Sequence, residues 1–260
     1  MKRTTANEDD GERTGREGTL PRSPDDSRDE PETPQHDLVA SPWGRESPAL
    51  AGDLRRGNVV LGLGSGIDVL LTAQQVGPTG RVIGVELTDK MIERTRSRVA
   101  AAHLNYVEIR KGVSEDLPVT DESVDWVISS CVISLSRDKE RVFDEMARAL
   151  RPGGRVRIAD VVAQRLPDWV QHSDGLRDSC VGGAISEQDY VAGLRLAGLS
   201  DITVGGRYVY DRVQLAELAG GARMSSADVN RVSDELVGCL WSVYFSARKA
   251  LHQESETSAG

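Results

Sequence analysis

The sequence predicts an α/β fold, doubly wound around a mostly parallel sheet, with a C-terminal α+β extension. From about residue 57, short apolar runs alternate with segments that carry apolar residues at helical spacing. Such alternation produces parallel strands with helices on both faces. A glycine-rich turn, Gly62-Leu63-Gly64-Ser65-Gly66, joins the first apolar run to the first helical segment. Turns of this kind lie at the carboxyl edge of an open sheet, where ligands bind.

The first half of this region predicts five strands and three helices. The expected strands are residues 58–63, 81–85, 106–110, 124–129 and 155–161, and the expected helices are 67–75, 89–102 and 137–150. Ser136 is the expected N-cap of the third helix. The sequence Arg151-Pro152-Gly153-Gly154 is expected to end that helix and to turn the chain into the fifth strand.

The regular alternation of expected strands and helices ends after Val161. Residues 167–180 are weakly patterned, whereas a helix is expected from Ser186 to Ala197, with Asp189 at the capping-box position. Strands are expected at 202–210 and 239–247, with a helix at 226–237 between them. We therefore expect a core at 41–162 and an extension at 163–250 that completes the sheet.

Residues 1–40 have a different composition from the rest of the chain. They contain 6 Lys/Arg against 11 Asp/Glu, four prolines and few large apolar side chains. Such a segment cannot bury enough surface to offset its ordering entropy, so we predict a disordered acidic tail. A docking tail is the alternative interpretation.

The bulk composition limits the class of partner. The net charge is -9, and a chain without a basic excess is not expected to bind nucleic acid. No apolar run approaches the ~20 residues that span a bilayer, and the N-terminus lacks a hydrophobic signal segment, so a cytoplasmic protein without a membrane association is expected. The three cysteines are too few and too scattered for a disulfide framework, which predicts reduced thiols. The sequence does not determine the oligomeric state.

A strand, a glycine turn, a helix and a second strand lead to a single acid, Glu86. Glycines allow the backbone to approach a ligand closely, and the helix N-terminus adds N–H donors. A carboxylate about 20 residues downstream is placed to hydrogen-bond ribose hydroxyls. The unit therefore predicts a cofactor that contains a nucleoside.

This unit, followed by Arg151-Pro152-Gly153-Gly154, resembles the class I S-adenosylmethionine-dependent methyltransferases, which have a Rossmann-like fold. Three segments resemble the arsenite methyltransferases within that class. They are residues 67–71 followed by 76–80, residues 127–135 followed by 138–139, and residues 179–184. The similarity covers roughly residues 45 to 250.

The resemblance implies S-adenosylmethionine as cofactor and a trivalent arsenical as small-molecule substrate. Cys131 and Cys180 match the two cysteines that bind arsenic as thiolates in that family. The resemblance also implies contacts to the cofactor from Gly62, Gly64, Gly66, Asp68, Glu86, Val113 and Ser114. Glu86 would hold the ribose, and Val113 and Ser114 would flank the adenine.

The implied residues suit the implied chemistry. Trivalent arsenic is soft, as are thiolates, and two thiolates leave its lone pair free to attack a methyl group. No general base is then needed, which agrees with four histidines that form no constellation. Cys131 follows an expected strand at the ligand-binding edge of the sheet, and Cys180 lies in an irregular segment.

Two features depart from the family pattern. The acid that usually precedes the glycines is missing, and either Gly62 or Val60 occupies its position; we favour Gly62, which shortens the loop. A third cysteine is also missing upstream, and Cys239 is expected to pack in the core. Two alternatives therefore stay open. One is a methyltransferase for another small molecule, such as a thiol or a biosynthetic intermediate, and the other is a non-catalytic protein that kept the fold.

Overall fold

The structure is a computed structural model that describes residues 47, 53–64, 66–173, 175–176, 179–220 and 225–251. All of them belong to one unit, Gln35–Gly260. The predicted disordered tail lies outside the described residues.

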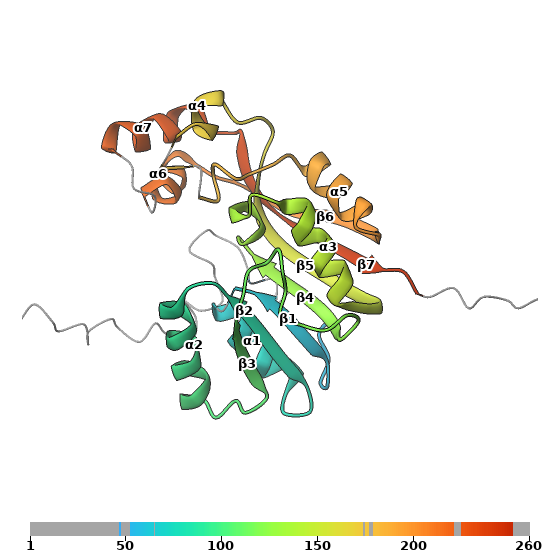
Figure 1. Cartoon of the computed structure of the whole chain (residues 1–260). Coiled ribbons are helices and arrows are strands. Elements are labelled where there is room, and N and C mark those ends of the chain that lie inside the picture. The colour runs from blue at the N-terminus through green and yellow to red at the C-terminus, as the bar shows by residue number, and fades with distance from the viewer. Residues whose placement is uncertain are drawn as a thin grey trace, which may run out of the picture. The chain divides into compact units, whose positions relative to one another are not determined.

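Seven strands form a single sheet in the order β3-β2-β1-β4-β5-β7-β6 (Figure 1). Strands β1 to β5 pair with one another in parallel, whereas β7 is antiparallel to both β5 and β6. The strands are β1 (Val59–Leu63), β2 (Arg81–Glu86), β3 (Val107–Lys111), β4 (Val124–Ser130), β5 (Leu150–Ala163), β6 (Leu199–Val209) and β7 (Leu240–Lys249). The predicted doubly wound, mostly parallel sheet is confirmed.

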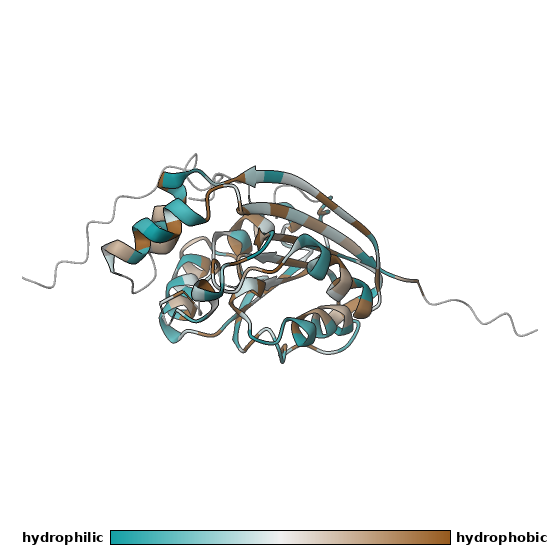
Figure 2. Cartoon of the chain, turned by 90° about the horizontal axis from the view of Figure 1, so that it is seen from above, coloured by the Kyte–Doolittle hydropathy of each residue, from teal (hydrophilic) through white to brown (hydrophobic). Residues whose placement is uncertain are grey.

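Helices cover both faces of this sheet. Helices α1 (Ile67–Val76) and α2 (Asp89–Ala101) pack over one face, and α3 (Lys139–Ala149) and α5 (Glu187–Leu196) pack over the other. Successive strand residues point to opposite faces, so Val60 joins the first of these cores and Leu61 joins the second. Figure 2 shows hydrophilic and hydrophobic residues alternating along the helices, as expected when one side of a helix faces a core.

A third core lies beyond the carboxyl end of β5. It joins residues of α4 (Asp168–Gln171), α6 (Arg212–Gly220) and α7 (Ser226–Glu235) to the last residues of β5. Figure 1 shows these three helices gathered at one end of the sheet. The sequence predicted α7 but neither α4 nor α6. Helix α6 has almost no amphipathic character, so its periodicity gave no signal.

The start of α3 corrects one prediction. Ser136 ends a 3₁₀ turn, Ile133–Leu135, and is not the N-cap of the helix. The N-cap is Asp138, whose carboxylate accepts a hydrogen bond from the Arg141 N–H at 3.0 Å. The 3₁₀ turn after β4 occupies Ile133–Leu135, and the helix begins at Lys139, two residues later than predicted.

The turn at Arg151-Pro152-Gly153-Gly154 also differs from the prediction. Strand β5 already begins at Leu150, which pairs with Val124, and the pairing then shifts so that Trp126 faces Arg155. The four residues therefore form an irregularity inside one strand. Gly153 has a φ of +80°, a conformation that glycine adopts without strain.

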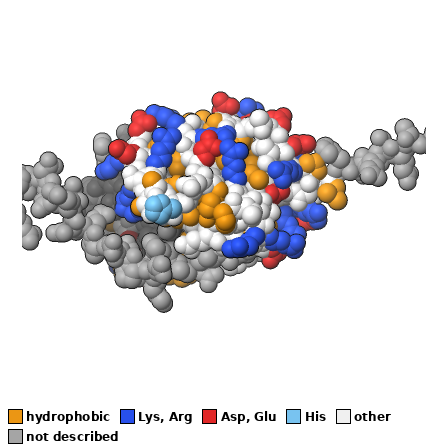
Figure 3. Space-filling model, turned by 90° about the horizontal axis from the view of Figure 1, so that it is seen from below, with side chains coloured by type: hydrophobic (Ala, Val, Ile, Leu, Met, Phe, Trp, Pro, Cys, Tyr) orange, Lys and Arg blue, Asp and Glu red, His pale blue; other side chains and the backbone are white. Residues whose placement is uncertain are grey.

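One face of the protein carries mixed charge. On the face that Figure 3 shows, basic and acidic side chains are interspersed with scattered hydrophobic atoms. None of the described helices combines the length and the apolar character that crossing a bilayer requires.

Candidate functional site

A cavity of about 280 Å³ opens where β1, β2, β3 and β4 end. Its lining comes from the last residues of β1 and β2 and from the segments that follow the four strands, so residues distant in the chain meet at one edge of the sheet. The lining residues are Leu63, Gly64, Val85, Glu86, Leu87, Thr88, Gly112, Val113, Ser114, Glu115, Val132, Leu135 and Ser136.

Glu86 is the acid at the end of β2, and its carboxylate is fixed by the backbone that follows it. Oε1 accepts hydrogen bonds from the Leu87 N–H at 3.1 Å and from the Thr88 N–H at 3.0 Å. The hydroxyl of Thr88 donates to the same oxygen at 3.0 Å. The strand end therefore holds a hydrogen-bond acceptor at the wall of the cavity.

Gly64 makes the turn that opens the cavity. Its φ is +87°, which side chains rarely adopt, and its N–H donates to the Val85 carbonyl at 2.8 Å. A Cβ atom at this position would lie 3.2 Å from Cγ2 of Val132, across the cavity wall. Glycine thus fits both the backbone conformation and the narrow space.

Three of the apolar side chains that line the cavity are left partly exposed by the protein. Leu87 is 61% exposed, Leu135 is 47% exposed and Val113 is 39% exposed. Exposed apolar groups that converge on one cleft favour a flat, apolar ligand group such as a purine ring. Together with the Glu86 carboxylate, which suits a ribose diol, these walls fit a nucleoside-containing cofactor.

Four of the seven predicted cofactor residues line the cavity. They are Gly64, Glu86, Val113 and Ser114. The other lining residues were missed, although most are neighbours of predicted residues in the chain. Leu87 follows Glu86, and Val132 follows Cys131, so extending each motif by a few residues would have included them.

Gly62, Gly66 and Asp68 lie outside this lining, and their contact with a cofactor stays a prediction. Gly62 lies inside β1, where a Cβ would be 3.3 Å from Cγ2 of Val69, so it allows α1 to pack closely on the strand. Gly66 is the exposed N-cap of α1. Asp68 accepts a hydrogen bond from the hydroxyl of Ser47.

The structure brings Cys131 and Cys180 together although they are 49 residues apart. The thiol of Cys180 donates to the backbone carbonyl of Cys131, with a sulfur–oxygen distance of 3.5 Å. Cys131 directly follows β4, and its N–H donates to the Ala159 carbonyl at 2.9 Å. The next residue, Val132, lines the cavity. The cysteine pair therefore lies beside the candidate cofactor site.

Cys239 lies just before β7, and it is half-buried rather than packed in the core as the sequence predicted. Its carbonyl accepts from the N–H of Gln164, whereas Cys131 pairs with Ala159. Ala159 and Gln164 are five residues apart, which corresponds to roughly 16 Å along a strand. All three cysteines are thiols, as the sequence predicted, but only two of them adjoin.

A buried acid, Asp160, lies behind the Cys131 segment. It is fully buried, and its Oδ2 accepts from the Ser134 N–H at 3.0 Å and from the Tyr190 hydroxyl at 3.0 Å. Oδ1 accepts from the Val161 N–H at 2.8 Å. Burial raises the pKa of Asp160, and these three hydrogen bonds oppose that rise. Asp160 was not predicted as a site residue, because its signal in the sequence is a single acid inside an apolar strand.

A neighbouring lysine supports the same segment. Lys139 Nζ donates to the Ser136 carbonyl at 2.7 Å, and burial lowers the pKa of this amine. Ser136 in turn donates its hydroxyl to Glu115 across the cavity wall. The turn after β4 is thus held by charged groups on both sides.

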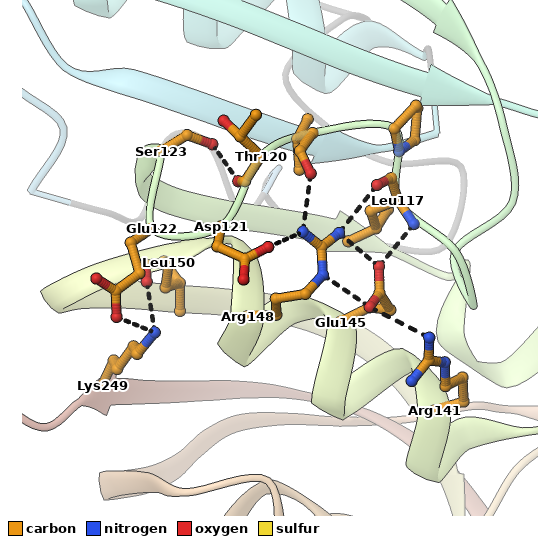
Figure 4. Close-up of polar contacts among 12 residues, drawn as sticks. Leu117, Thr120, Asp121, Glu122, Ser123, Arg141, Glu145, Arg148, Leu150 and Lys249 are labelled. Carbon is orange, nitrogen blue, oxygen red and sulfur yellow. Dashed lines mark hydrogen bonds and ion pairs between the residues drawn. The ribbon is translucent and has the colours of Figure 1, made fainter.

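Helix α3 holds the segment that follows β3 through Glu145 and Arg148 (Figure 4). The Arg148 guanidinium donates to both oxygens of Glu145, at 2.8 and 2.7 Å, and to the Leu117 carbonyl at 3.0 Å. Glu145 also accepts from the Leu117 N–H at 2.8 Å. This arrangement fixes the segment that carries Ser114.

Comparisons with known proteins agree with this geometry. A family model described as a methyltransferase domain matches residues 54–198. An arsenite methyltransferase of Halobacterium salinarum is 45% identical over 164 residues, which cover 62% of this chain and 42% of that protein. One of Aquipseudomonas alcaligenes is 38% identical over 186 residues, which cover 64% of this chain and 51% of that protein. The chain thus spans about half the length of these relatives.

A solved structure extends the similarity to the fold. An arsenic(III) S-adenosylmethionine methyltransferase from Chlamydomonas reinhardtii superposes with a TM-score of 0.60 at 29% identity, covering 76% of this chain and 64% of that one. The predicted class I methyltransferase resemblance is confirmed, and with it S-adenosylmethionine as the cofactor. The family model matches more than half of the residues, so the chain belongs to the methyltransferase domain family.

Proposed function

We propose that the protein transfers a methyl group from S-adenosylmethionine to a trivalent arsenical held by Cys131 and Cys180. The observation that carries the proposal is the contact between these two cysteines, directly beside the cavity at the sheet edge. The similarity to relatives described as arsenite methyltransferases supports it.

The residues of the cavity would hold the cofactor by complementary groups. Glu86 would accept hydrogen bonds from the ribose hydroxyls, because its carboxylate is fixed at the end of β2. Val113, Leu87 and Leu135 would cover the faces of the adenine. When bound, S-adenosylmethionine supplies an electrophilic methyl group on a sulfonium centre.

The cysteines would hold the substrate. As thiolates they are soft ligands, which match trivalent arsenic and replace its oxygen ligands. Two such ligands fix the direction of the arsenic lone pair, which is the nucleophile. Orientation alone supplies much of the rate of such a transfer, and no side chain has to remove a proton from the substrate. Accordingly, no histidine lines the described cavity.

Titration with S-adenosylmethionine, with and without methylarsenite, tests the proposal. We expect cofactor binding in both cases and methyl transfer that is lost in Cys131→Ser and in Cys180→Ser. Cys239→Ser is the matched control and should keep full turnover. Turnover that survives Cys131→Ser would point to a different methyl acceptor, and absence of cofactor binding would point to a non-catalytic protein.

A further inference from the structure

Besides the Cys180–Cys131 hydrogen bond, the two segments that carry the cysteines approach each other closely at a glycine, Gly183. A Cβ placed on Gly183 would lie 1.7 Å from the carbonyl oxygen of Ser134 and 2.8 Å from its carbonyl carbon. Real Cβ contacts are essentially never shorter than 3.0 Å, so any side chain at this position would push the two backbones apart. Gly183 does not have a positive φ, so the close approach, rather than the backbone conformation, is what requires glycine.

Gly183 belongs to the same turn as Cys180. The Gly183 N–H donates to the Ser179 carbonyl at 3.0 Å, and the Gly182 N–H donates to the Ser179 hydroxyl at 3.3 Å. These bonds close a loop around the cysteine. A displacement of Gly183 is therefore carried to the Cys180 sulfur.

The other side of the contact is fixed by Asp160. Ser134, which Gly183 faces, is 2% exposed and donates its N–H to the buried Asp160 carboxylate at 3.0 Å. Ser134 lies three residues after Cys131, in the 3₁₀ turn Ile133–Leu135. The Cys131 N–H also donates a hydrogen bond to the Ala159 carbonyl, so the segment Cys131–Ser134 is held at both ends. The Cys180 turn must move instead.

We propose that Gly183 and Asp160 are positioning residues that set the separation of the two thiols. Asp160 fixes the Cys131 segment from behind, and Gly183 lets the Cys180 turn pack against it. The inference rests on the proposed function, because the separation matters only if one atom must bind both sulfurs.

The size of the effect follows from the contact distance. To bring a Cβ at Gly183 from 1.7 Å to 3.0 Å, the segments must separate by 1.3 Å along that line, the difference between the two distances. Ligand sites need their groups held within about 0.5 Å, and misplacement by about 1 Å costs roughly a hundredfold in reactions that depend on orientation. Binding of one arsenic atom by both sulfurs should therefore weaken by about tenfold or more in Gly183→Ala.

The experiment compares a reagent that needs both thiols with one that needs a single thiol. The affinity for phenylarsine oxide, a trivalent arsenical that binds two thiols, is measured by calorimetry on the full chain. The rate of alkylation by iodoacetamide is measured separately at Cys131 and Cys180. Gly205→Ala is the control, because it adds the same methyl group where nothing lies within 4 Å.

Gly183→Ala should lose affinity for phenylarsine oxide by about tenfold or more, while alkylation of each thiol stays within about twofold of the wild-type rate. A general loss of structure would instead speed up alkylation. Asp160→Asn should also lower the affinity for phenylarsine oxide, because its amide N–H₂ would face groups that donate hydrogen bonds to the carboxylate. It also carries the test if Gly183→Ala does not fold.

Two failures can be told apart. If the wild type binds phenylarsine oxide no better than Cys131→Ser, the proposed function fails and this inference falls with it. If the wild type requires both cysteines but Gly183→Ala and Asp160→Asn bind like the wild type, only the positioning role is overturned.

Discussion

The brace between Glu145 and Arg148 offers the prediction whose magnitude the structure constrains best. Glu145 is 3% exposed and Arg148 is 29% exposed, and the Arg148 guanidinium makes five hydrogen bonds in all (Figure 4). Replacing Arg148 by Met keeps the apolar stem and removes the charge. It leaves the Glu145 carboxylate buried without its principal partner.

Breaking a buried ion pair costs about 3–5 kcal/mol, because the remaining charge stays desolvated. Part of that cost is offset here, since Arg141 stays 3.6 Å from Glu145 and the Leu117 N–H still donates to it. The bond to Asp121 adds little, because that carboxylate is 75% exposed. We therefore expect Arg148→Met to lower the free energy of unfolding by about 3 kcal/mol, which corresponds to a fall in Tm of roughly 6–12 °C.

Urea unfolding followed by circular dichroism measures this loss. Arg81→Met is the matched control, since its pair with Glu108 is 53% and 43% exposed and should contribute less than about 1 kcal/mol. The double variant Glu145→Leu with Arg148→Met should be less destabilised than the sum of the two single changes, by about 2 kcal/mol. A loss below about 1 kcal/mol in Arg148→Met, or strict additivity, would refute the reasoning.

Three further predictions concern the site, the core and acid stability. Glu86→Gln should weaken S-adenosylmethionine binding by about tenfold, read by calorimetry, because a charged acceptor for the ribose is lost; unchanged affinity would contradict the assignment. Gly193→Ala places a Cβ 2.4 Å from Cε2 of the buried Phe143 and should lower the unfolding free energy by about 1–3 kcal/mol, whereas Gly205→Ala should not. The Arg148 guanidinium lowers the pKa of Glu145, so this pair stabilises the fold above about pH 4.3 and loses its effect as the pH falls through the folded-state pKa. Unfolding curves of Glu145→Gln should accordingly depend less on pH below 5, and equal slopes would exclude this role.

Local pattern was sufficient for most of the architecture. Strands β1 to β4 and helices α1, α2 and α5 lie within a residue or two of the predicted ranges, because alternation, glycine turns and caps act between neighbours in the chain. The start of α5 is one example: the Ser186 hydroxyl caps the helix by accepting from the Asp189 N–H at 3.1 Å. The N-cap of α3 was wrong because a 3₁₀ turn intervenes, and such a turn carries no periodic signal.

The site was predictable only in part. Glu86 and Gly64 are recognisable because each belongs to a local motif with a fixed place after a strand. Asp160 was not recognisable, since its role depends on Ser134 and Tyr190, which are distant in the chain and meet it only through packing. Gly183 belongs to a segment that resembles the arsenite methyltransferases, but no neighbouring residue in the sequence indicates that Ser134 lies against it.

The sequence by itself determined the class of fold, the edge of the sheet where a nucleoside is expected to bind, and the two cysteines that are candidates for binding the substrate. These follow from interactions over a few residues and from the direction of parallel strands. Only the tertiary structure decided that Cys180 contacts Cys131, that Gly183 lies against Ser134, and that the Ser134 N–H donates to the buried Asp160. Such contacts depend on how three separate cores pack, and packing is a property of the whole chain rather than of any segment.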